Sequence, residues 1–227
     1  LAERGLAHAR IGVEMDNYYY SAKAHAVLTE SLPEATFADA TALVNRARAV
    51  KSGEEIAFMR RAARITERLI DIALDRVAVG LPKNALVAEI MAAQAEGADG
   101  HWGDYPAIVP LLPTGADASA PHLTWDGRPF AAGEATFFEL SGCYRRYHAP
   151  LCRTVFLGTP PQAFRDAETA LVEGLEAGLE AARPGNTAGD VARALYGALE
   201  RAGIHREGRC GYPIGLSYPP DWGERTI

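Results

Sequence analysis

The segment from Phe138 to Phe156 limits the possible folds of this 227-residue chain more than any other stretch. It mixes aromatic and β-branched residues with the turn formers glycine, proline and serine, a pattern typical of short antiparallel strands. The pattern predicts three strands, the last two joined by a tight hairpin: Ala135–Leu140, Tyr144–Tyr147 and Leu151–Leu157. By alternation Glu139 points away from Phe138 and Leu140, so we expect its carboxylate in a cleft. The alternative is a surface charge on an edge strand.

Helices flank these strands in the sequence. Apolar residues at helical spacing predict a long helix from Ser52 to about Val79, a second after Asn84, and two more at Pro161–Ala182 and Thr187–Ala202. Two pairs of residues spaced as capping boxes, Ser52 with Glu55 and Thr187 with Asp190, mark helix starts. This order of elements predicts an α+β fold, with antiparallel strands covered by helices on one face.

Residues 1–51 are predicted to form a separate unit, the end of an α/β domain, followed by a second domain over residues 52–227. The evidence is a strand, a helix and a second strand, expected at Arg10–Asp16, Ser21–Leu32 and Ala35–Asp39. The chain starts at Leu1 without a methionine and stops just after a run rich in glycine, proline and aromatic residues. We therefore expect it to be a fragment of a longer protein.

The composition excludes several kinds of partner. A net charge of −6 argues against nucleic acid and against anionic membrane surfaces. No apolar run approaches the roughly 20 residues of a membrane span. The three cysteines, Cys143, Cys152 and Cys210, are odd in number and never spaced as CxxC, so reduced thiols in a cytoplasmic protein are expected. Cys143 and Cys152 are predicted to be small buried hydrophobes rather than nucleophiles.

Common catalytic signatures such as HExxH, GxSxG and GxxxxGK[ST] are missing, which leaves a loop-rich region as the place to search. His122 lies in a loop before the strands, and histidine suits proton transfer near neutral pH. Taken alone, it is better explained as a loop histidine bonded to backbone. His148 and Arg153 follow in the hairpin and are predicted to bind substrate. The alternative for Arg153 is a structural role as an ion-pair partner.

A second group of candidates lies near the end of the chain. Tyr212 stands between glycines in Gly211-Tyr-Pro-Ile-Gly215, a turn that lets backbone approach a ligand. Trp222 and Glu224 follow, and are predicted to supply an apolar wall and a hydrogen-bond acceptor. An ordinary surface turn is the alternative for this run.

Taken together, these segments resemble the metallopeptidase family M24, which includes methionine aminopeptidase, prolidase, Xaa-Pro aminopeptidase and creatinase. The similarity covers about residues 50–227 and is carried by the lead-in Ala42–Arg60, the hairpin ending Arg153-Thr-Val-Phe156, and Gly211–Gly215. It implies the family's pita-bread fold, with residues 1–51 as the end of a creatinase-type amino-terminal domain. At the family's metal-ligand positions this chain has Glu139, Pro150 and Tyr212. Proline offers no lone pair, so the resemblance implies no metal and no other cofactor.

Within the family, four segments are similar to the ectoine hydrolases, which open a cyclic amidine: Tyr105–Pro113, Pro121–Trp125, Cys143–His148 and Gly211–Glu224. The resemblance implies a small-molecule hydrolase that forms a homodimer like its relatives, with His122 as general acid and base. Glu139 would orient His122 or contact the amidinium, and Arg153 or Arg225 would hold the substrate carboxylate. The alternatives are a metal-dependent Xaa-Pro aminopeptidase or prolidase, and a catalytically inactive pita-bread binding module.

Overall fold

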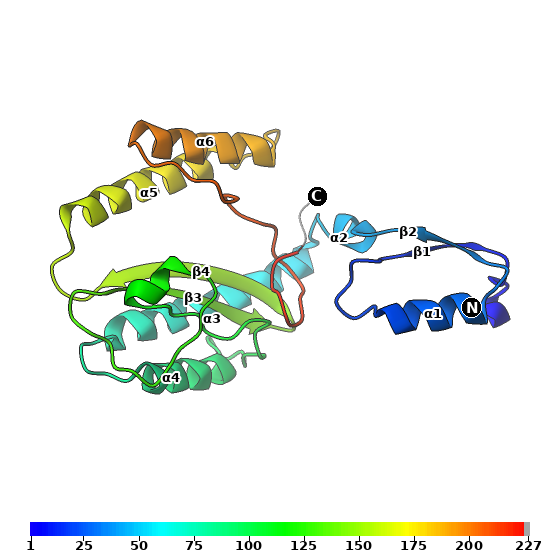
Figure 1. The fold of residues 1–227 in the computed structure, drawn as a ribbon, viewed down its shortest axis with the longest axis horizontal. Coiled ribbons are helices and arrows are strands. Elements are labelled where there is room, and N and C mark those ends of the chain that lie inside the picture. Colours follow the sequence, from blue (N-terminus) through cyan, green and yellow to red (C-terminus); the bar gives the residue numbers. More distant parts are fainter. Residues whose placement is uncertain (225–227) are drawn as a thin grey trace. The chain divides into compact units, whose positions relative to one another are not determined.

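The computed structural model describes residues 1–224 of the chain, which divide into two compact units, 1–53 and 54–224 (Figure 1). The assignment of residues 1–51 and 52–227 to two separate domains stays a prediction. None of the helices in the described part of the chain is long and apolar enough to cross a membrane.

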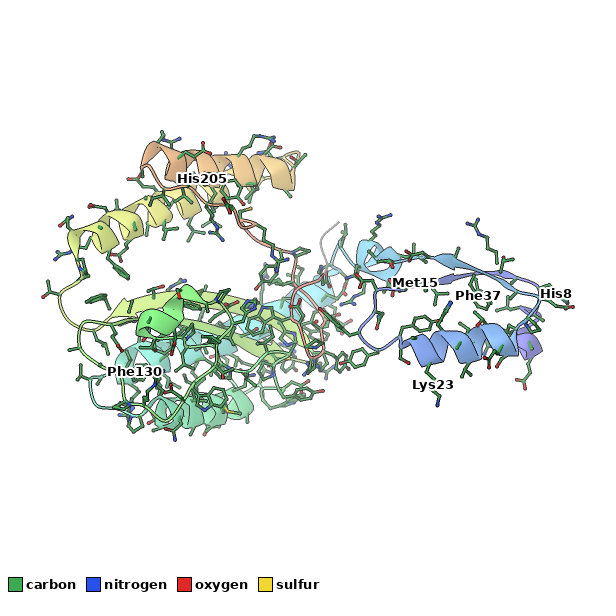
Figure 2. The ribbon with its side chains drawn as sticks, viewed as in Figure 1. His8, Met15, Lys23, Phe37, Phe130 and His205 are labelled. Carbon is green, nitrogen blue, oxygen red and sulfur yellow. The ribbon has the colours of Figure 1, made fainter. Side chains whose placement is uncertain are left out.

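The smaller unit is built on a parallel pair of strands, β1 (Arg10–Val13) and β2 (Thr36–Asp39), in which Arg10 lies opposite Thr36. Parallel strands need a crossover connection, and α1 (Ala22–Ser31) supplies it, with Ser21 capping its first turn. Phe37 of β2 packs edge-on against His25 of α1 at 6.2 Å between ring centroids (Figure 2). The unit is completed by the short helices η1 (Ala2–Arg4) and α2 (Leu43–Ala47).

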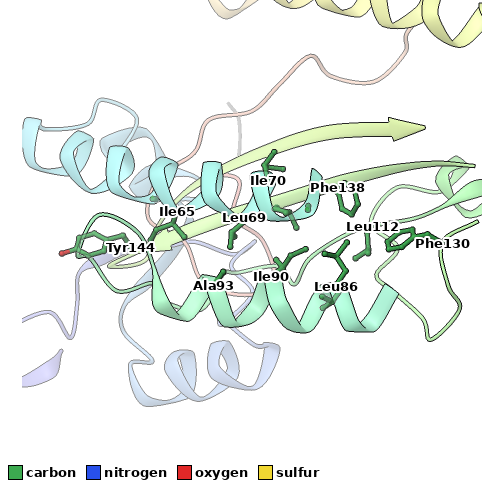
Figure 3. Close-up of a cluster of buried hydrophobic side chains, with 14 residues drawn as sticks. Ile65, Leu69, Ile70, Leu86, Ile90, Ala93, Leu112, Phe130, Phe138 and Tyr144 are labelled. Atoms are coloured by element: carbon green, nitrogen blue, oxygen red, sulfur yellow. The ribbon is translucent and has the colours of Figure 1, made fainter. Parts of the chain in front are cut away.

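The larger unit packs two helices against one face of an antiparallel hairpin. The helices are α3 (Gly53–Arg76) and α4 (Lys83–Glu96), and the strands are β3 (Ala135–Tyr144) and β4 (Tyr147–Phe156). The buried core between them takes Ile65 and Leu69 from α3, Ile90 from α4, and Phe138 and Leu140 from β3 (Figure 3). Each such side chain contributes roughly 1.5–3 kcal/mol by leaving water. The helix-covered antiparallel arrangement predicted from the sequence is therefore present.

The prediction of three strands in this region was wrong, because β3 and β4 are two longer strands joined by a turn at Arg145 and Arg146. Gly142 and Pro150 suggested breaks but lie inside the strands. The Pro150 nitrogen points away from β3, as does that of His148, whose N–H donates to the Gly215 oxygen at 3.0 Å. Proline at this position therefore removes no hydrogen bond from the β3–β4 ladder.

The apolar run Ala107–Leu112 does not form a regular strand. Within this run Leu111 pairs with β3, through two backbone hydrogen bonds to Glu139 of 2.9 and 3.2 Å. Prolines at 106, 110 and 113 explain this, because proline has no N–H with which to extend the pairing. The short helix η2 (Gly115–Ser119) follows.

The last two helices, α5 (Gln162–Ala181) and α6 (Ala188–Arg201), pack against each other. Gly174 and Gly178 of α5 face Leu195 of α6 and allow close approach. The predicted capping box of Thr187 and Asp190 is confirmed, with both of its hydrogen bonds present.

Candidate active site

The candidate site lies on the face of the β3–β4 hairpin that α3 and α4 do not cover. Phe138 and Leu140 point into the core, so alternation places Glu139 and Ser141 on the opposite face. The register adds their cross-strand neighbours, Cys152 beside Glu139 and Pro150 beside Ser141. Because Leu111 fixes the Glu139 backbone from the other side, the carboxylate projects from a rigid three-segment platform.

Glu139 is half-buried, and burial raises the pKa of its carboxyl group above the ordinary value. The charge of His122 opposes this rise, so the imidazole lies within electrostatic range of the Glu139 carboxylate. Within residues 1–224 no donor hydrogen-bonds to the Glu139 carboxylate. A carboxylate placed in this way is suited to receive a cationic ligand.

His122 is exposed and belongs to the loop after η2. Its φ of 65° lies in the left-handed region, which is uncommon for a residue other than glycine, although histidine enters it more readily than most. Strained backbone of this kind clusters at functional sites. The structure places the two predicted catalytic residues, His122 and Glu139, within electrostatic range of each other.

The 211–224 loop forms a wall beside this platform. Leu216 pairs with Tyr147 at the start of β4. Within the loop, the indole nitrogen of Trp222, a residue only 1% exposed, donates to the Tyr212 hydroxyl at 2.8 Å. A Cβ at Gly223 would lie 3.1 Å from the Tyr212 ring, so glycine permits this close packing.

Electrostatics link Tyr212 to the platform. Burial raises the pKa of its hydroxyl, the Trp222 hydrogen bond lowers it, and the Glu139 charge raises it again. The net shift is upward, so the hydroxyl remains protonated at neutral pH and can donate a hydrogen bond. Arg209, which the sequence did not indicate, places its guanidinium 4.6 Å from the centre of the Tyr212 ring.

Two of the predicted substrate-binding residues lie elsewhere. Arg153 is the cross-strand neighbour of Phe138, on the face opposite to Glu139, and its exposed side chain donates to the Cys152 carbonyl at 2.7 Å. His148 is fully buried, and its Nε2 accepts from the Ala107 N–H at 2.9 Å. Burial, and next the charge of Arg146, lower the pKa of His148 to about 4, so it is a neutral brace for the 103–110 loop.

The last two predicted binding residues, Glu224 and Arg225, lie at the end of the chain. Glu224 is buried, and its N–H closes the 211–224 loop by donating to the Pro213 carbonyl at 2.8 Å. Arg225 lies outside the described residues.

Cys143 is buried as predicted, and burial raises its pKa to about 12. Cys152 is exposed beside Glu139, so its predicted burial was wrong. Desolvation, and next the charge of Glu139, raise the pKa of its thiol to about 11, which agrees with the prediction that it is not a nucleophile.

A sequence model of metallopeptidase family M24 matches residues 57–225. The chain belongs to this family. It is 56% identical over its whole length to the ectoine hydrolase of Halomonas elongata, and it spans 58% of that relative's length. It is also 42% identical, over 95% of its length, to an uncharacterized hydrolase/peptidase of Sinorhizobium fredii, of which it spans 55%. The resemblance found in the sequence is therefore confirmed.

Solved structures of M24 proteins show the same fold. A prolidase from Pyrococcus horikoshii superposes with a TM-score of 0.82 at 19% identity, over 95% of this chain and 60% of its own. A prolidase from Pyrococcus furiosus has a TM-score of 0.79 at 18% identity, over 100% and 67%. The predicted α+β pita-bread fold is confirmed by these similarities, which concern the fold alone.

Membership of a metallopeptidase family implies a metal centre, and the residues that we matched to its ligands do not fit one. Of the three, Glu139 has a carboxylate, Pro150 has no donor atom, and the Tyr212 hydroxyl already accepts from Trp222. Across residues 1–224, no three histidine, cysteine or acidic side chains gather closely enough to hold an ion.

Proposed function

We propose that the full-length M24 protein hydrolyses the cyclic amidine ring of ectoine to N-acetyl-2,4-diaminobutyrate, without a metal ion. One observation supports the chemistry: the half-buried carboxyl group of Glu139, whose pKa is raised by burial, lies within electrostatic range of the exposed His122 side chain. The 56% identity to the Halomonas elongata ectoine hydrolase supports the choice of substrate.

The chemical argument starts from the charge of the substrate. A peptide carbonyl is a poor electrophile that metallopeptidases activate with bound metal, whereas a protonated amidine already carries positive charge at its central carbon. Such a carbon needs a base that delivers water, a carboxylate that holds the cation, and an acid that protonates the leaving nitrogen. Glu139 and His122 provide these groups.

We assign the steps as follows. His122 takes a proton from the attacking water as its oxygen bonds to the amidinium carbon. His122 then returns this proton to one ring nitrogen, and the bond between that nitrogen and the carbon breaks. The second proton of the attacking water then moves from the new hydroxyl group to the departing nitrogen. That nitrogen leaves as an ammonium group, and the oxygen of the water becomes the acetyl oxygen. The amidinium charge is thereby conserved.

The surrounding residues bind the substrate in this proposal. The protonated Tyr212 hydroxyl donates a hydrogen bond, while Trp222 and Glu224 hold the wall in place. Arg209, stacked on Tyr212, is better placed than Arg153 to pair with the substrate carboxylate, because Arg153 lies on the other face of the hairpin. We also expect a homodimer, as the resemblance implies, and a cytoplasmic location, as the cysteine pattern indicates.

The deciding experiment incubates the full-length protein with ectoine and, separately, with a Xaa-Pro dipeptide, and follows products by mass spectrometry. Ring-opened product from ectoine alone supports the proposal. Cleavage of the dipeptide with ectoine left intact would establish the peptidase alternative. Inertness towards both substrates would refute the proposed reaction and favour the binding-module alternative.

A further inference from the structure

The turn between β3 and β4 contains two adjacent arginines in an unusual conformation. Arg145 and Arg146 have φ values of 49° and 68°, the left-handed region that such two-residue turns usually fill with asparagine and glycine. Each non-glycine residue there carries about 1–2 kcal/mol of strain. Arg145 is exposed, but Arg146 is only 7% exposed, so the two side chains have different environments.

The Arg146 guanidinium joins two loops that are far apart in the sequence. On one side it donates to the Tyr105 carbonyl and lies 3.4 Å from the Asp104 carboxylate. On the other it donates twice to the Ser217 carbonyl, at 2.9 and 3.2 Å. Its two ring contacts come from the same loops, at 4.1 Å from the Tyr105 centroid and 4.6 Å from the Tyr218 centroid.

Both loops border the candidate site. The first continues to Leu111, which pairs with the Glu139 backbone. The second holds Tyr212 and Trp222, and its Ser217 N–H donates to the Arg146 carbonyl at 2.9 Å. Arg146 therefore lies at the point where the platform and the wall of the site are tied together.

Only arginine suits these contacts. Its planar guanidinium carries five N–H donors and can stack on aromatic rings. A lysine ammonium keeps the charge but cannot reach both carbonyls while stacking on Tyr105 and Tyr218. Replacing Arg146 with lysine therefore keeps the positive charge and removes the planar set of donors, so it distinguishes the effect of the charge from that of the guanidinium geometry.

We propose that Arg146 is a positioning residue, whose clamp on the 103–110 and 211–224 loops holds Tyr212 and Trp222 in register with Glu139. The catalytic consequence rests on the proposed function, since it assumes that Tyr212 contacts the substrate. The structural consequence does not: without the clamp, the 211–224 loop separates more often from the start of β4.

The test compares Arg146→Lys and Arg146→Met in the full-length protein with Arg145→Met, its neighbour in the same turn. Tyr218→Leu, which removes one exposed ring and keeps every Arg146 hydrogen bond, is a milder variant in case the others fail to fold. Hydrogen exchange of peptides covering 211–224 reports loop separation without any substrate. Steady-state kinetics with ectoine, measured well below each melting temperature, report kcat and KM separately.

We expect at least tenfold faster exchange in 211–224 for both Arg146 variants, a smaller increase for Tyr218→Leu, and no change for Arg145→Met. Loss of register should lower kcat/KM by roughly 10²-fold, mostly through kcat. Unchanged exchange in this segment for folded Arg146→Lys or Tyr218→Leu would overturn the clamp. Equal loss of protection throughout the chain would also overturn it. If the unaltered protein leaves ectoine intact, the proposed function fails, and hydrogen exchange alone still decides the inference.

Discussion

At the scale of single residues, the candidate site contains residues held in an unfavourable charge environment or backbone conformation. Glu139 retains a carboxyl group where burial disfavours its charge, and His122 adopts a left-handed backbone conformation. Both features are unfavourable for folding, and neither is needed by the core, which lies on the other face of the hairpin. Residues of this kind are candidates for function rather than for stability.

Removal of the His122 imidazole should lower kcat for ectoine about 10²–10⁴-fold, the usual contribution of an acid–base catalyst. His122→Asn is the better variant, because asparagine also accepts the left-handed backbone, and His122→Ala completes the pair. The exposed His205 provides a control as His205→Ala, which should leave kcat unchanged (Figure 2). Near-normal turnover in His122→Asn would remove this histidine from the mechanism.

Replacement of Glu139 by glutamine should abolish most turnover and yet stabilise the substrate-free protein at neutral pH. Because burial raises the folded-state pKa, the native state binds a proton more tightly than the unfolded state does. The stability of the unaltered protein therefore falls as pH rises from the ordinary glutamate pKa through the raised one. Thermal unfolding at several pH values should show Glu139→Gln gaining most above that window and little below it.

The exposed Glu168 serves as the matched control, and Glu168→Gln should show no such pH-dependent gain. A stability difference for Glu139→Gln that is constant with pH would mean that the carboxyl group is not perturbed as described.

At the scale of elements, the hairpin has one face for packing and one for chemistry. Gly142 lets α3 approach β3, because a Cβ there would lie 2.1 Å from the Ala62 oxygen. Thr66 of α3 accepts from the Gly142 N–H at 2.7 Å and donates to the Ala149 carbonyl at 2.6 Å, so one hydroxyl bonds to both strands. The platform that presents Glu139 is thus held from behind by the helix.

Gly142→Ala should therefore destabilise the protein by about 1–3 kcal/mol, because the added methyl group pushes α3 away from the hairpin. Denaturant unfolding measures this difference directly. Gly127→Ala is the matched control, since nothing lies within 4 Å of a Cβ at that exposed position. Equal stability of the two variants would contradict the close packing of α3 on β3.

At the scale of the whole molecule, the chain has the fold of a metallopeptidase family, but the residues at the positions that we matched to its metal ligands do not fit a metal centre. The family model covers residues 57–225, and prolidase structures share the fold at 18–19% identity. Backbone arrangement has thus been kept where Pro150 and Tyr212 occupy positions that we matched to metal ligands. Fold alone does not decide the reaction, which depends on the side chains at the site.

Metal removal tests this view on the full-length protein. Exhaustive dialysis against a chelator should leave turnover of ectoine unchanged, and elemental analysis should find transition metals well below one ion per chain. Turnover that disappears with the metal and returns on adding Mn²⁺, Co²⁺ or Zn²⁺ would refute the metal-free mechanism.

The sequence by itself determined the fold class, most of the helices, the capping box at Thr187 and the candidates His122 and Glu139. These features follow from local patterns: apolar spacing, cap residues, and alternation along a strand. The resemblance to M24 added the fold, because its motifs combine segments that no local pattern connects.

Only the tertiary structure decided which candidates share a face. Whether β3 continues through Gly142 depends on α3, and that continuity sets the register that brings Cys152 beside Glu139 and turns Arg153 away. The buried state of His148 and the contacts of Arg146 likewise depend on loops about 40 and 70 residues away in the chain. Such relations arise from packing between distant segments, and a one-residue change of strand register is enough to reverse them.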